Sequence, residues 1–229
     1  MTLQINDPTR LQAVSISDVV QTARARKPEF YAGYGKRLMD LSIILLTAPI
    51  TVPLLLLTAL IVALDGHNPL YVQKRVGRGG RIFKMWKFRS MVPNADHILE
   101  AHLQAHPEAR EEWNHSQKLR NDPRVTRFGA LIRKCSLDEL PQIINVLRGD
   151  MSLIGPRPMM VGQTNLYPGQ CYYWMRPGIS GLWQVTDRND TAFTARAQYD
   201  DKYFHNLSFT NDCSIIAKTF VVVLLGTGY

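Results

Sequence analysis

Apolar residues gather in one long run, residues 41–64, which contains no charged side chain. A helix that crosses a bilayer needs roughly 20 apolar residues, so this run is long enough to enter a membrane. Pro49 and Pro53 stand near its middle, and each proline removes a backbone donor and crowds the preceding turn. The pattern therefore predicts an apolar helix that breaks at these prolines rather than a straight span.

Basic residues flank this run on both sides. Two precede it and four follow it after a short polar gap: Lys36, Arg37, Lys74, Arg75, Arg78 and Arg81. Lysine and arginine favour the cytoplasmic side of a membrane, so both ends are expected on the same face. A re-entrant helix-break-helix hairpin, which enters the bilayer, turns at Pro49 and Pro53 and returns, fits this charge pattern.

Polar and apolar positions alternate in residues 71–76 and again in residues 81–90. Glycines at 77, 79 and 80 link the two stretches and permit a positive φ. The pattern predicts a β-hairpin.

Helical patterns follow the hairpin, so the fold class is predicted as α+β and mostly helical. Residues 95–118 are typical of a surface helix that is interrupted near Pro107, and a last apolar helix is expected at about residues 212–225. Residues 175–190, rich in Gly, Pro and Arg, are predicted to be a loop region. Three parts result: a loosely ordered arm at 1–35, a membrane segment at 36–66 and a cytosolic catalytic domain at 67–229.

Composition narrows the partners. The chain has 229 residues and a formal net charge of +8, and its three cysteines lie far apart without a CxxC pair. No disulfide framework or zinc site is suggested, which fits a reducing, cytosolic setting. Beside a membrane segment, the positive charge favours anionic lipid head groups and phosphorylated substrates over nucleic acid.

Two adjacent carboxylates, Asp138 and Glu139, lie in the segment SLDELP, which is typical of a helix start. Ser136 and Glu139 match a capping box, whereas Asp138 as the cap would place Pro141 more comfortably. In either register both acids fall in the first turn. They could serve only as caps, and the hexapeptide alone leaves that alternative open.

Cations close to this pair suggest a site that handles phosphates. Arg133 lies just upstream, and Arg157 lies downstream between two prolines that hold the backbone extended. A carboxylate can form a covalent phosphoryl intermediate. A neighbouring carboxylate can help bind Mg²⁺, which takes one or two protein carboxylates together with substrate phosphates.

Four motifs resemble those of the bacterial sugar transferases, the monotopic phosphoglycosyl transferases that initiate surface-glycan assembly. They occupy Lys87–Met91, Ser136–Gln142, Gly149–Pro158 and Arg176–Val185, in the family's order. The resemblance runs from about Lys36 to the C-terminus and matches a small member that consists of the catalytic module. It implies interfacial amphipathic helices, a location on the cytoplasmic face of the inner membrane, and Mg²⁺ as cofactor.

The resemblance also implies a reaction and the residues that perform it. A sugar phosphate would pass from a UDP-sugar to polyprenyl phosphate, with release of UMP, in the first membrane step of exopolysaccharide assembly. Asp138 would be the nucleophile, and Glu139 would help bind Mg²⁺. Four cations would surround the phosphates and two further acids would complete the polar site: Lys87, Arg133, Arg157 and Arg188, then Asp200 and Asp212.

Two other function classes explain less of the sequence. A membrane-anchored basic binding module would account for the charge but not for two acids ringed by arginines. A glycosidase needs carboxylates on opposite sides of a sugar, and it would leave the arginines unexplained. No residue pattern identifies the sugar, although UDP-galactose or UDP-glucose is expected as the donor. The oligomeric state does not follow from the sequence either, and a homodimer is one alternative.

Overall fold

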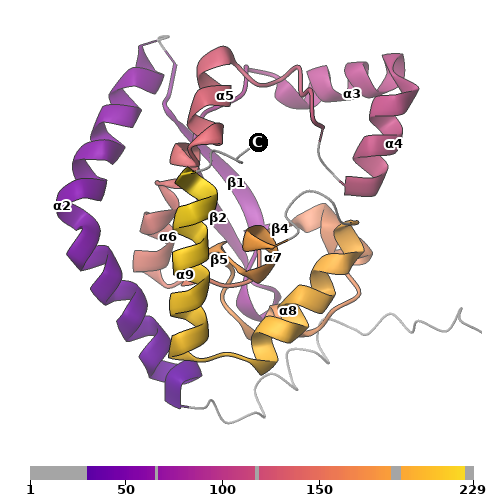
Figure 1. Cartoon of the computed structure of the whole chain (residues 1–229). Coiled ribbons are helices and arrows are strands. Elements are labelled where there is room, and N and C mark those ends of the chain that lie inside the picture. The colour runs from indigo at the N-terminus through magenta and orange to yellow at the C-terminus, as the bar shows by residue number, and fades with distance from the viewer. Residues whose placement is uncertain (1–29, 65–66, 117–118, 187–191, 225–229) are drawn as a thin grey trace, which may run out of the picture.

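The computed structural model describes residues 30–64, 67–116, 119–186 and 192–224. Within them the chain is mostly helical, with small sheets and one long apolar helix near its N-terminus (Figure 1). The predicted α+β class is thereby confirmed. Residues 1–29 of the predicted arm lie outside the described residues. The rest of the arm, residues 30–35, is helical and leads into the long helix.

The long helix α2 comprises Lys36–Ala63 and follows a turn of π-helix, η1, at Tyr31–Gly35. It continues through both prolines, and Figure 1 shows it bent near its middle. One bent helix thus stands where two helices separated by a break were predicted. Threonine hydroxyls help to explain the bend: Thr47 donates to the Ile43 carbonyl and Thr51 to the Thr47 carbonyl, and such back-bonding bends helices.

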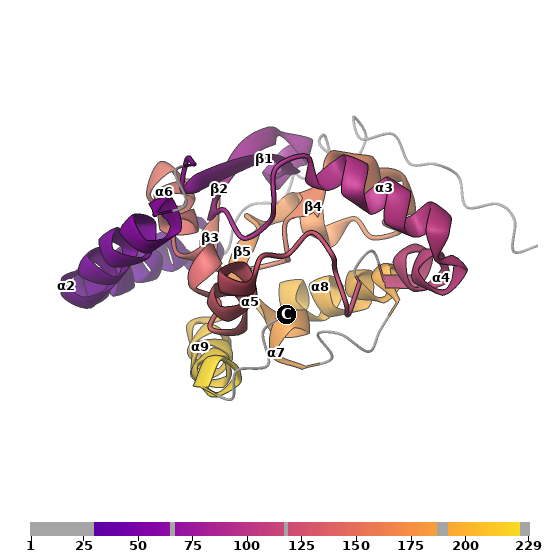
Figure 2. The same cartoon turned by 90° about the horizontal axis from the view of Figure 1, so that it is seen from above.

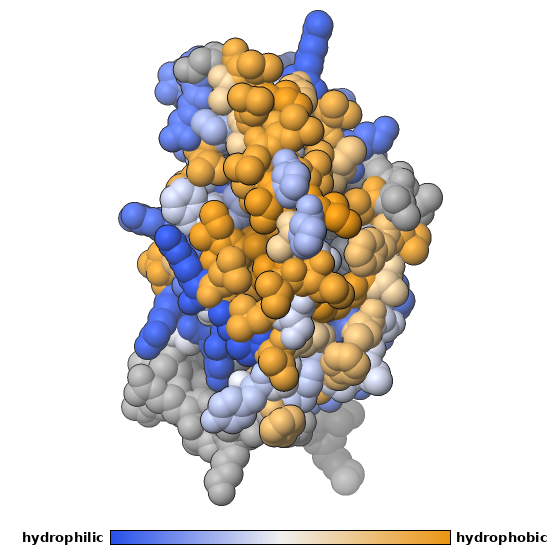
Figure 3. All heavy atoms as spheres, turned by 90° about the vertical axis from the view of Figure 1, so that its left-hand side faces the viewer, coloured by the Kyte–Doolittle hydropathy of each residue, from blue (hydrophilic) through white to orange (hydrophobic). Residues whose placement is uncertain are grey.

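The side chains of α2 face outward over most of its length. Leu45, Leu46 and Ile50 are more than 70% exposed, and the helical stretch Tyr31–Ala63 is long and apolar enough to cross a membrane. Figure 3 shows this flank of the molecule as a broad hydrophobic surface with hydrophilic side chains at its margin. An exposed apolar surface of this kind marks a membrane or protein contact.

The predicted hairpin is present. Strand β1, Leu70–Val76, pairs antiparallel with β2, Ile82–Phe88, through a turn at Arg78–Gly80 (η2) in which Gly79 and Gly80 have positive φ. Strand β4, Met159–Met160, adds to the free edge of β1. A second, parallel pair joins β3, Ser152–Ile154, to β5, Gly178–Ser180, so the region predicted as loop contains a strand and the short helix α7, Leu182–Val185.

Helices cover the sheets on several sides (Figures 1 and 2). The surface helix divides at Pro107 as predicted, and the last helix begins three residues before its predicted start. The remaining helices are α3 (Ala95–Ala105), α4 (Pro107–Ser116), α5 (Arg127–Lys134), α6 (Gln142–Arg148), α8 (Arg196–His205) and α9 (Phe209–Leu224), with 3-10 turns η3 (Leu137–Glu139), η4 (Val161–Leu166), η5 (Cys171–Trp174) and η6 (Phe193–Ala195).

Two buried acids fasten α2 to this core. Asp40 accepts hydrogen bonds from the Ser152 hydroxyl at 2.8 Å and from the Leu153 amide at 3.1 Å. Lys36 pairs with Asp212 of α9 at 2.6 Å. Both contacts lie at the N-terminal end of α2, so this end is fixed to the folded core while the apolar part extends along its flank.

Candidate active site

The site is built around the turn η3, which carries Asp138 and Glu139 between α5 and α6. Helix α5 is capped by Thr126, whose hydroxyl accepts from the Gly129 amide at 2.8 Å. At Gly129 a Cβ atom would lie 2.0 Å from the Ser90 carbonyl oxygen, so only glycine allows α5 to approach the end of β2 this closely. The close approach brings the turn after α5 beside the strand that carries Lys87.

The predicted capping arrangement is wrong. Ser136 has a φ of +54°, in the left-handed region, and makes no capping hydrogen bond. Helix α6 starts at Gln142, with Pro141 rather than Ser136 or Asp138 at the N-cap. The N-cap amide has no intrahelical partner, so a residue without an N–H is tolerated there. As a consequence, neither carboxylate serves as the helix cap.

A single lysine bridges the two acids. The Lys87 ammonium lies 2.7 Å from Glu139 Oε1 and 3.5 Å from Asp138 Oδ2. Asp138 is buried, with 6% of its surface exposed. The structure therefore brings together three of the predicted site residues from two elements, β2 and η3.

The electrostatics of Asp138 are balanced between opposing influences. Burial raises the pKa of its carboxyl above the usual value, Lys87 opposes this rise, and the neighbouring charge of Glu139 adds to it. Arg133 and Arg157 also favour the ionised form. Asp138 is thus a desolvated carboxylate that nearby cations keep available for chemistry.

Arg133 and Arg157 approach the acids from two sides. Arg133, in the last turn of α5, donates from Nε to the Ser90 hydroxyl at 2.8 Å. Arg157 lies 3.9 Å from Glu139 Oε1, on the loop between β3 and β4. Because each guanidinium has five N–H donors, both retain donors for a ligand.

The loop that carries Arg157 rests directly on a neighbouring backbone. A Cβ at Gly155 would lie 2.4 Å from the Arg176 carbonyl oxygen, and one at Gly178 would lie 2.1 Å from the Gly155 nitrogen. Reciprocal hydrogen bonds, Gly155 N to Ser180 O and Gly178 N to Pro156 O, hold the segments together. Two glycines therefore set the position of Arg157.

A small cavity opens between the acids and this loop. Its lining includes Arg75, Lys87, Glu139, Gln142, Arg157 and Gln184. Arg75, Gln142 and Gln184 were not predicted as site residues. Arg75 lies in the alternating stretch of β1 and Gln184 lies within one of the four motifs, but nothing in the sequence places either residue beside Glu139.

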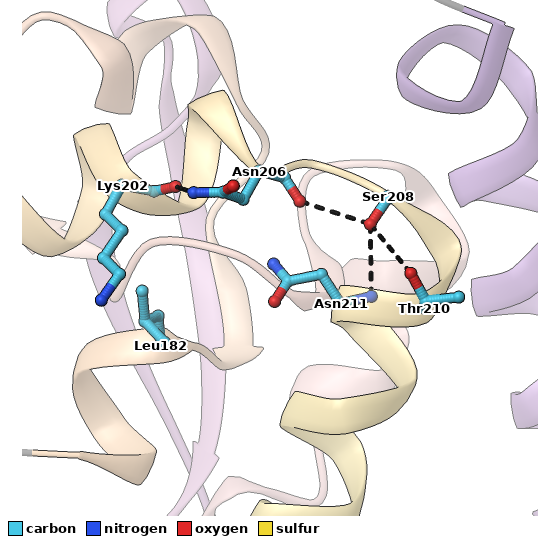
Figure 4. A pocket seen from close by; sticks show the side chains of 6 residues that line it. All are labelled: Leu182, Lys202, Asn206, Ser208, Thr210 and Asn211. Atoms are coloured by element: carbon cyan, nitrogen blue, oxygen red, sulfur yellow. Dashed lines mark hydrogen bonds between the residues drawn. The ribbon is translucent and has the colours of Figure 1, made fainter.

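A larger hollow of about 440 Å³ lies elsewhere, between α7, the end of α8 and the start of α9 (Figure 4). Its lining carries one cation, Lys202, and otherwise neutral side chains. Ser208 and Asn206 are engaged there in local hydrogen bonds that shape the turn before α9. The hollow lacks the acids and arginines of the smaller cavity, which we take as the reaction site.

The two supporting acids have different surroundings. Asp200 accepts from the Tyr167 hydroxyl at 2.6 Å, and burial raises its pKa to about 7. Its charge also acts on Arg196, which in turn is repelled by Arg157. Asp200 is therefore connected electrostatically to the arginines of the site.

Asp212 belongs to a separate cluster. It is fully buried and receives hydrogen bonds of 2.6 Å from Tyr31, Lys36 and Tyr203. These partners join the start of α2 to α8 and α9. Arg188, the fourth predicted phosphate ligand, lies outside the described residues.

The donor set suits Mg²⁺ only in combination with a ligand. Among the described residues no group of three or more His, Cys, Asp and Glu side chains could hold a metal. Asp138 and Glu139 nevertheless both reach a single cation, the Lys87 ammonium. Mg²⁺ commonly binds through one or two carboxylates plus substrate phosphates, and the residues present fit that arrangement.

Comparison with known proteins decides the family. The model of the family described as bacterial sugar transferase matches residues 31–226. The chain belongs to the bacterial sugar transferase family. The match extends from the turn before α2 through α9, so it includes the apolar helix as well as the candidate site of this sugar transferase.

Several curated relatives are similar to this sugar transferase. A UDP-galactose-lipid carrier transferase of Erwinia amylovora is 48% identical over 195 residues, which cover 84% of this chain and 41% of the relative. The exopolysaccharide production protein ExoY of Rhizobium meliloti is 41% identical over 199 residues, or 86% and 88% of the two chains. An undecaprenyl-phosphate galactose phosphotransferase of Salmonella typhimurium is 44% identical over 195 residues, with 84% and 41% coverage.

The relatives therefore differ in length. The matched region spans about two fifths of the Erwinia and Salmonella proteins but nearly all of ExoY. What this sugar transferase has in common with the longer relatives is the region that contains the four motifs and the candidate site.

Proposed function

We propose that this protein transfers a sugar phosphate from a UDP-sugar to polyprenyl phosphate and releases UMP. Membership of the sugar transferase family and the names of the relatives support this reaction. The observation that carries it is the buried Asp138 beside Glu139, with Lys87 and Arg157 within 4 Å of the pair and Arg133 acting on Asp138 electrostatically. Acids ringed by cations suit a phosphoryl group better than a neutral substrate.

In the first step, a carboxylate oxygen of Asp138 attacks the phosphorus that bears the sugar. The bond from that phosphorus to the bridging oxygen breaks, and UMP leaves with the bond's electron pair. An aspartyl phosphosugar remains on the protein. Lys87, Arg133 and Arg157 counter the charge that develops on the phosphate oxygens, which is the main contribution to phosphoryl transfer.

In the second step, a phosphate oxygen of the polyprenyl phosphate attacks the same phosphorus. The bond to Asp138 breaks, the carboxylate is regenerated, and a lipid diphosphate sugar is formed. Glu139 would hold Mg²⁺ together with the substrate phosphates. When bound, this ion neutralises part of the phosphate charge.

The acceptor is a membrane lipid, and α2 supplies a membrane contact. We propose that α2 enters the cytoplasmic face of the inner membrane and returns to it, with the bend at Pro49 and Pro53 as the turning point. The basic residues on both flanks support this topology. A tag at residue 1 should be cytosolic in intact cells, like one at residue 229, and a periplasmic tag at residue 1 would show that α2 crosses.

UDP-galactose is the first sugar donor to test. Three relatives are named for galactose or galactosyl transfer, whereas a more distant one, 37% identical, is named for N-acetylgalactosamine. UDP-galactose is therefore expected to be the best donor, followed by UDP-glucose.

The deciding experiment is a donor screen with the full chain in lipid nanodiscs that contain polyprenyl phosphate and Mg²⁺. UMP release and lipid-linked radiolabelled sugar would both be measured. Without the acceptor, a burst of UMP equal to the amount of protein is expected, because the covalent intermediate accumulates. If none of the UDP-sugars yields UMP, the proposed reaction is wrong, and UMP release without a burst would argue against the covalent route.

A further inference from the structure

Three arginines near the acidic pair act on one another electrostatically. Arg75 comes from β1, Arg157 from the loop before β4 and Arg196 from the start of α8. Burial and repulsion from Arg157 lower the pKa of Arg75 to about 10 and that of Arg196 to about 9. Holding three like charges together raises the free energy of the folded protein. A further interaction is needed to offset this unfavourable term.

The protein itself supplies little compensation for Arg75. Its Nη atoms donate to the Pro158 carbonyl at 3.1 Å and to the Gln73 side chain at 2.5 Å, and its buried Nε has no partner. A guanidinium offers five N–H donors, so several stay unused. Within the described residues the three arginines form one ion pair, the 3.9 Å contact between Arg157 and Glu139.

Arg196 is held by stacking rather than by an ion pair. Its guanidinium lies 4.2 Å from the Trp183 ring centroid and 4.7 Å from that of Phe193. Stacking fixes the position of the group without neutralising its charge. Asp200 is the acid that acts on it, and that carboxyl has a raised pKa.

The charges around the cavity leave a positive surplus. Its lining carries three cations, Arg75, Lys87 and Arg157, and one acid, Glu139. A ligand with at least two negative charges would balance the site.

We propose that Arg75, together with Arg157, binds the diphosphate of the nucleotide sugar donor, and that Arg196 supports this site electrostatically. The proposal rests on the proposed function, because the diphosphate is the doubly charged part of that donor. Arg75 lines the cavity beside Glu139 and Arg157, so its guanidinium belongs to the wall that a ligand bound there would meet. A purely structural buried arginine would be expected to have a carboxylate partner.

The test compares Arg75→Met, which removes the charge but keeps much of the volume, with Arg110→Met on the exposed helix α4. For Arg75→Met we expect the donor KM to rise about 10- to 100-fold with a much smaller change in kcat, because a charge-assisted contact is lost in ground and transition states alike. Arg110→Met should keep the wild-type KM. A wild-type KM in Arg75→Met would overturn the proposal.

Inorganic pyrophosphate separates this inference from the proposed reaction. Pyrophosphate should raise the Tm of the wild type and of Arg110→Met. In Arg75→Met the rise in Tm should be less than about half of the wild-type rise. If the wild type responds in this way but releases no UMP from any UDP-sugar, the anion site is real and the proposed reaction fails. An equal Tm rise in all three proteins would overturn the site.

Arg75→Lys covers the case in which Arg75→Met does not fold. Lysine keeps the charge and loses the planar fork, so its donor KM should lie between those of the wild type and the methionine variant. Arg75→Lys with wild-type KM and a wild-type Tm response would show that the fork does not bind the diphosphate.

Discussion

Two buried aspartates, Asp138 and Asp212, show how differently this fold uses the same side chain. Asp212 is fully enclosed and receives three hydrogen bonds of 2.6 Å, one of them from the Lys36 ammonium. Asp138 is almost as deeply buried, but its nearest cation, Lys87, lies 3.5 Å away and is closer to Glu139. One carboxylate is saturated by the protein, whereas the other retains lone pairs for a ligand.

The two environments suit different roles, one in stabilising the fold and the other in the reaction. A saturated buried carboxylate is inert, because any new partner would have to displace an existing one. A desolvated carboxylate with a loosely held cation is reactive, at some cost to the folded state. Asp212 thus anchors α2 to the core, whereas Asp138 suits the attacking role of the proposed reaction, although sequence motifs alone suggested one shared polar site.

The largest effect is expected from Asp138→Asn. The amide cannot act as the nucleophile, so turnover should fall about 10³-fold or more. The free energy of unfolding should stay the same or rise, because a buried charge has been removed. UMP release and chemical denaturation would be measured on the same preparation.

Wild-type turnover in Asp138→Asn would remove this residue from the nucleophile's role. A loss of activity accompanied by a loss of stability would leave the comparison with Asp212 without support. Asp96→Asn, on the exposed face of α3, is the matched control and should change neither quantity.

Asp212→Asn should show the opposite behaviour. It leaves the Lys36 ammonium buried without its charged partner, and breaking such a pair costs about 3–5 kcal/mol. Denaturation midpoints should drop accordingly, while the kcat of the folded fraction stays within about twofold of the wild type. Lost turnover at full stability would instead place Asp212 in the reaction site, as the sequence motifs predicted.

The smallest effect is expected in the pH dependence of Lys87→Met. This effect comes in addition to the loss of rate caused by removing the cation. The proposed reaction needs ionised Asp138, whose pKa burial raises and Lys87 lowers. Without the lysine this pKa rises further, so the acid limb of the kcat/KM profile should move to higher pH. Activity is then lost at acidic pH and retained at alkaline pH.

Lys84→Met provides the control for this shift, since Lys84 is exposed and lies on the opposite face of β2. Its profile should match the wild type. An acid limb that moves to lower pH in Lys87→Met, or does not move, would show that Lys87 does not tune Asp138.

Local patterns predicted local structure well. The hairpin follows from alternation and glycines within 20 residues, and the division between α3 and α4 follows from Pro107. The bend of α2 was anticipated from its prolines, but the continuity of the helix was not, because a proline pattern does not show how the freed backbone groups are satisfied.

Distant contacts could not be predicted in the same way. The strands β3 and β5 have three residues each, too short for a periodic signal, and they pair across more than 20 residues of chain. The bond from Tyr31 to Asp212 joins positions 181 residues apart. The positive φ of Ser136 is a property of the packed turn, so the sequence favoured a cap that the structure does not form.

The contact between Gly155 and Gly178 limits how this protein could be redesigned. Any side chain at either position would push the Arg157 loop away from β5, so both are closed to substitution whatever donor is wanted. A redesign for another sugar must therefore change cavity residues whose side chains do not replace a close contact between two backbones. Gln142 and Gln184 are the two to randomise first, because they line the cavity and bear no charge.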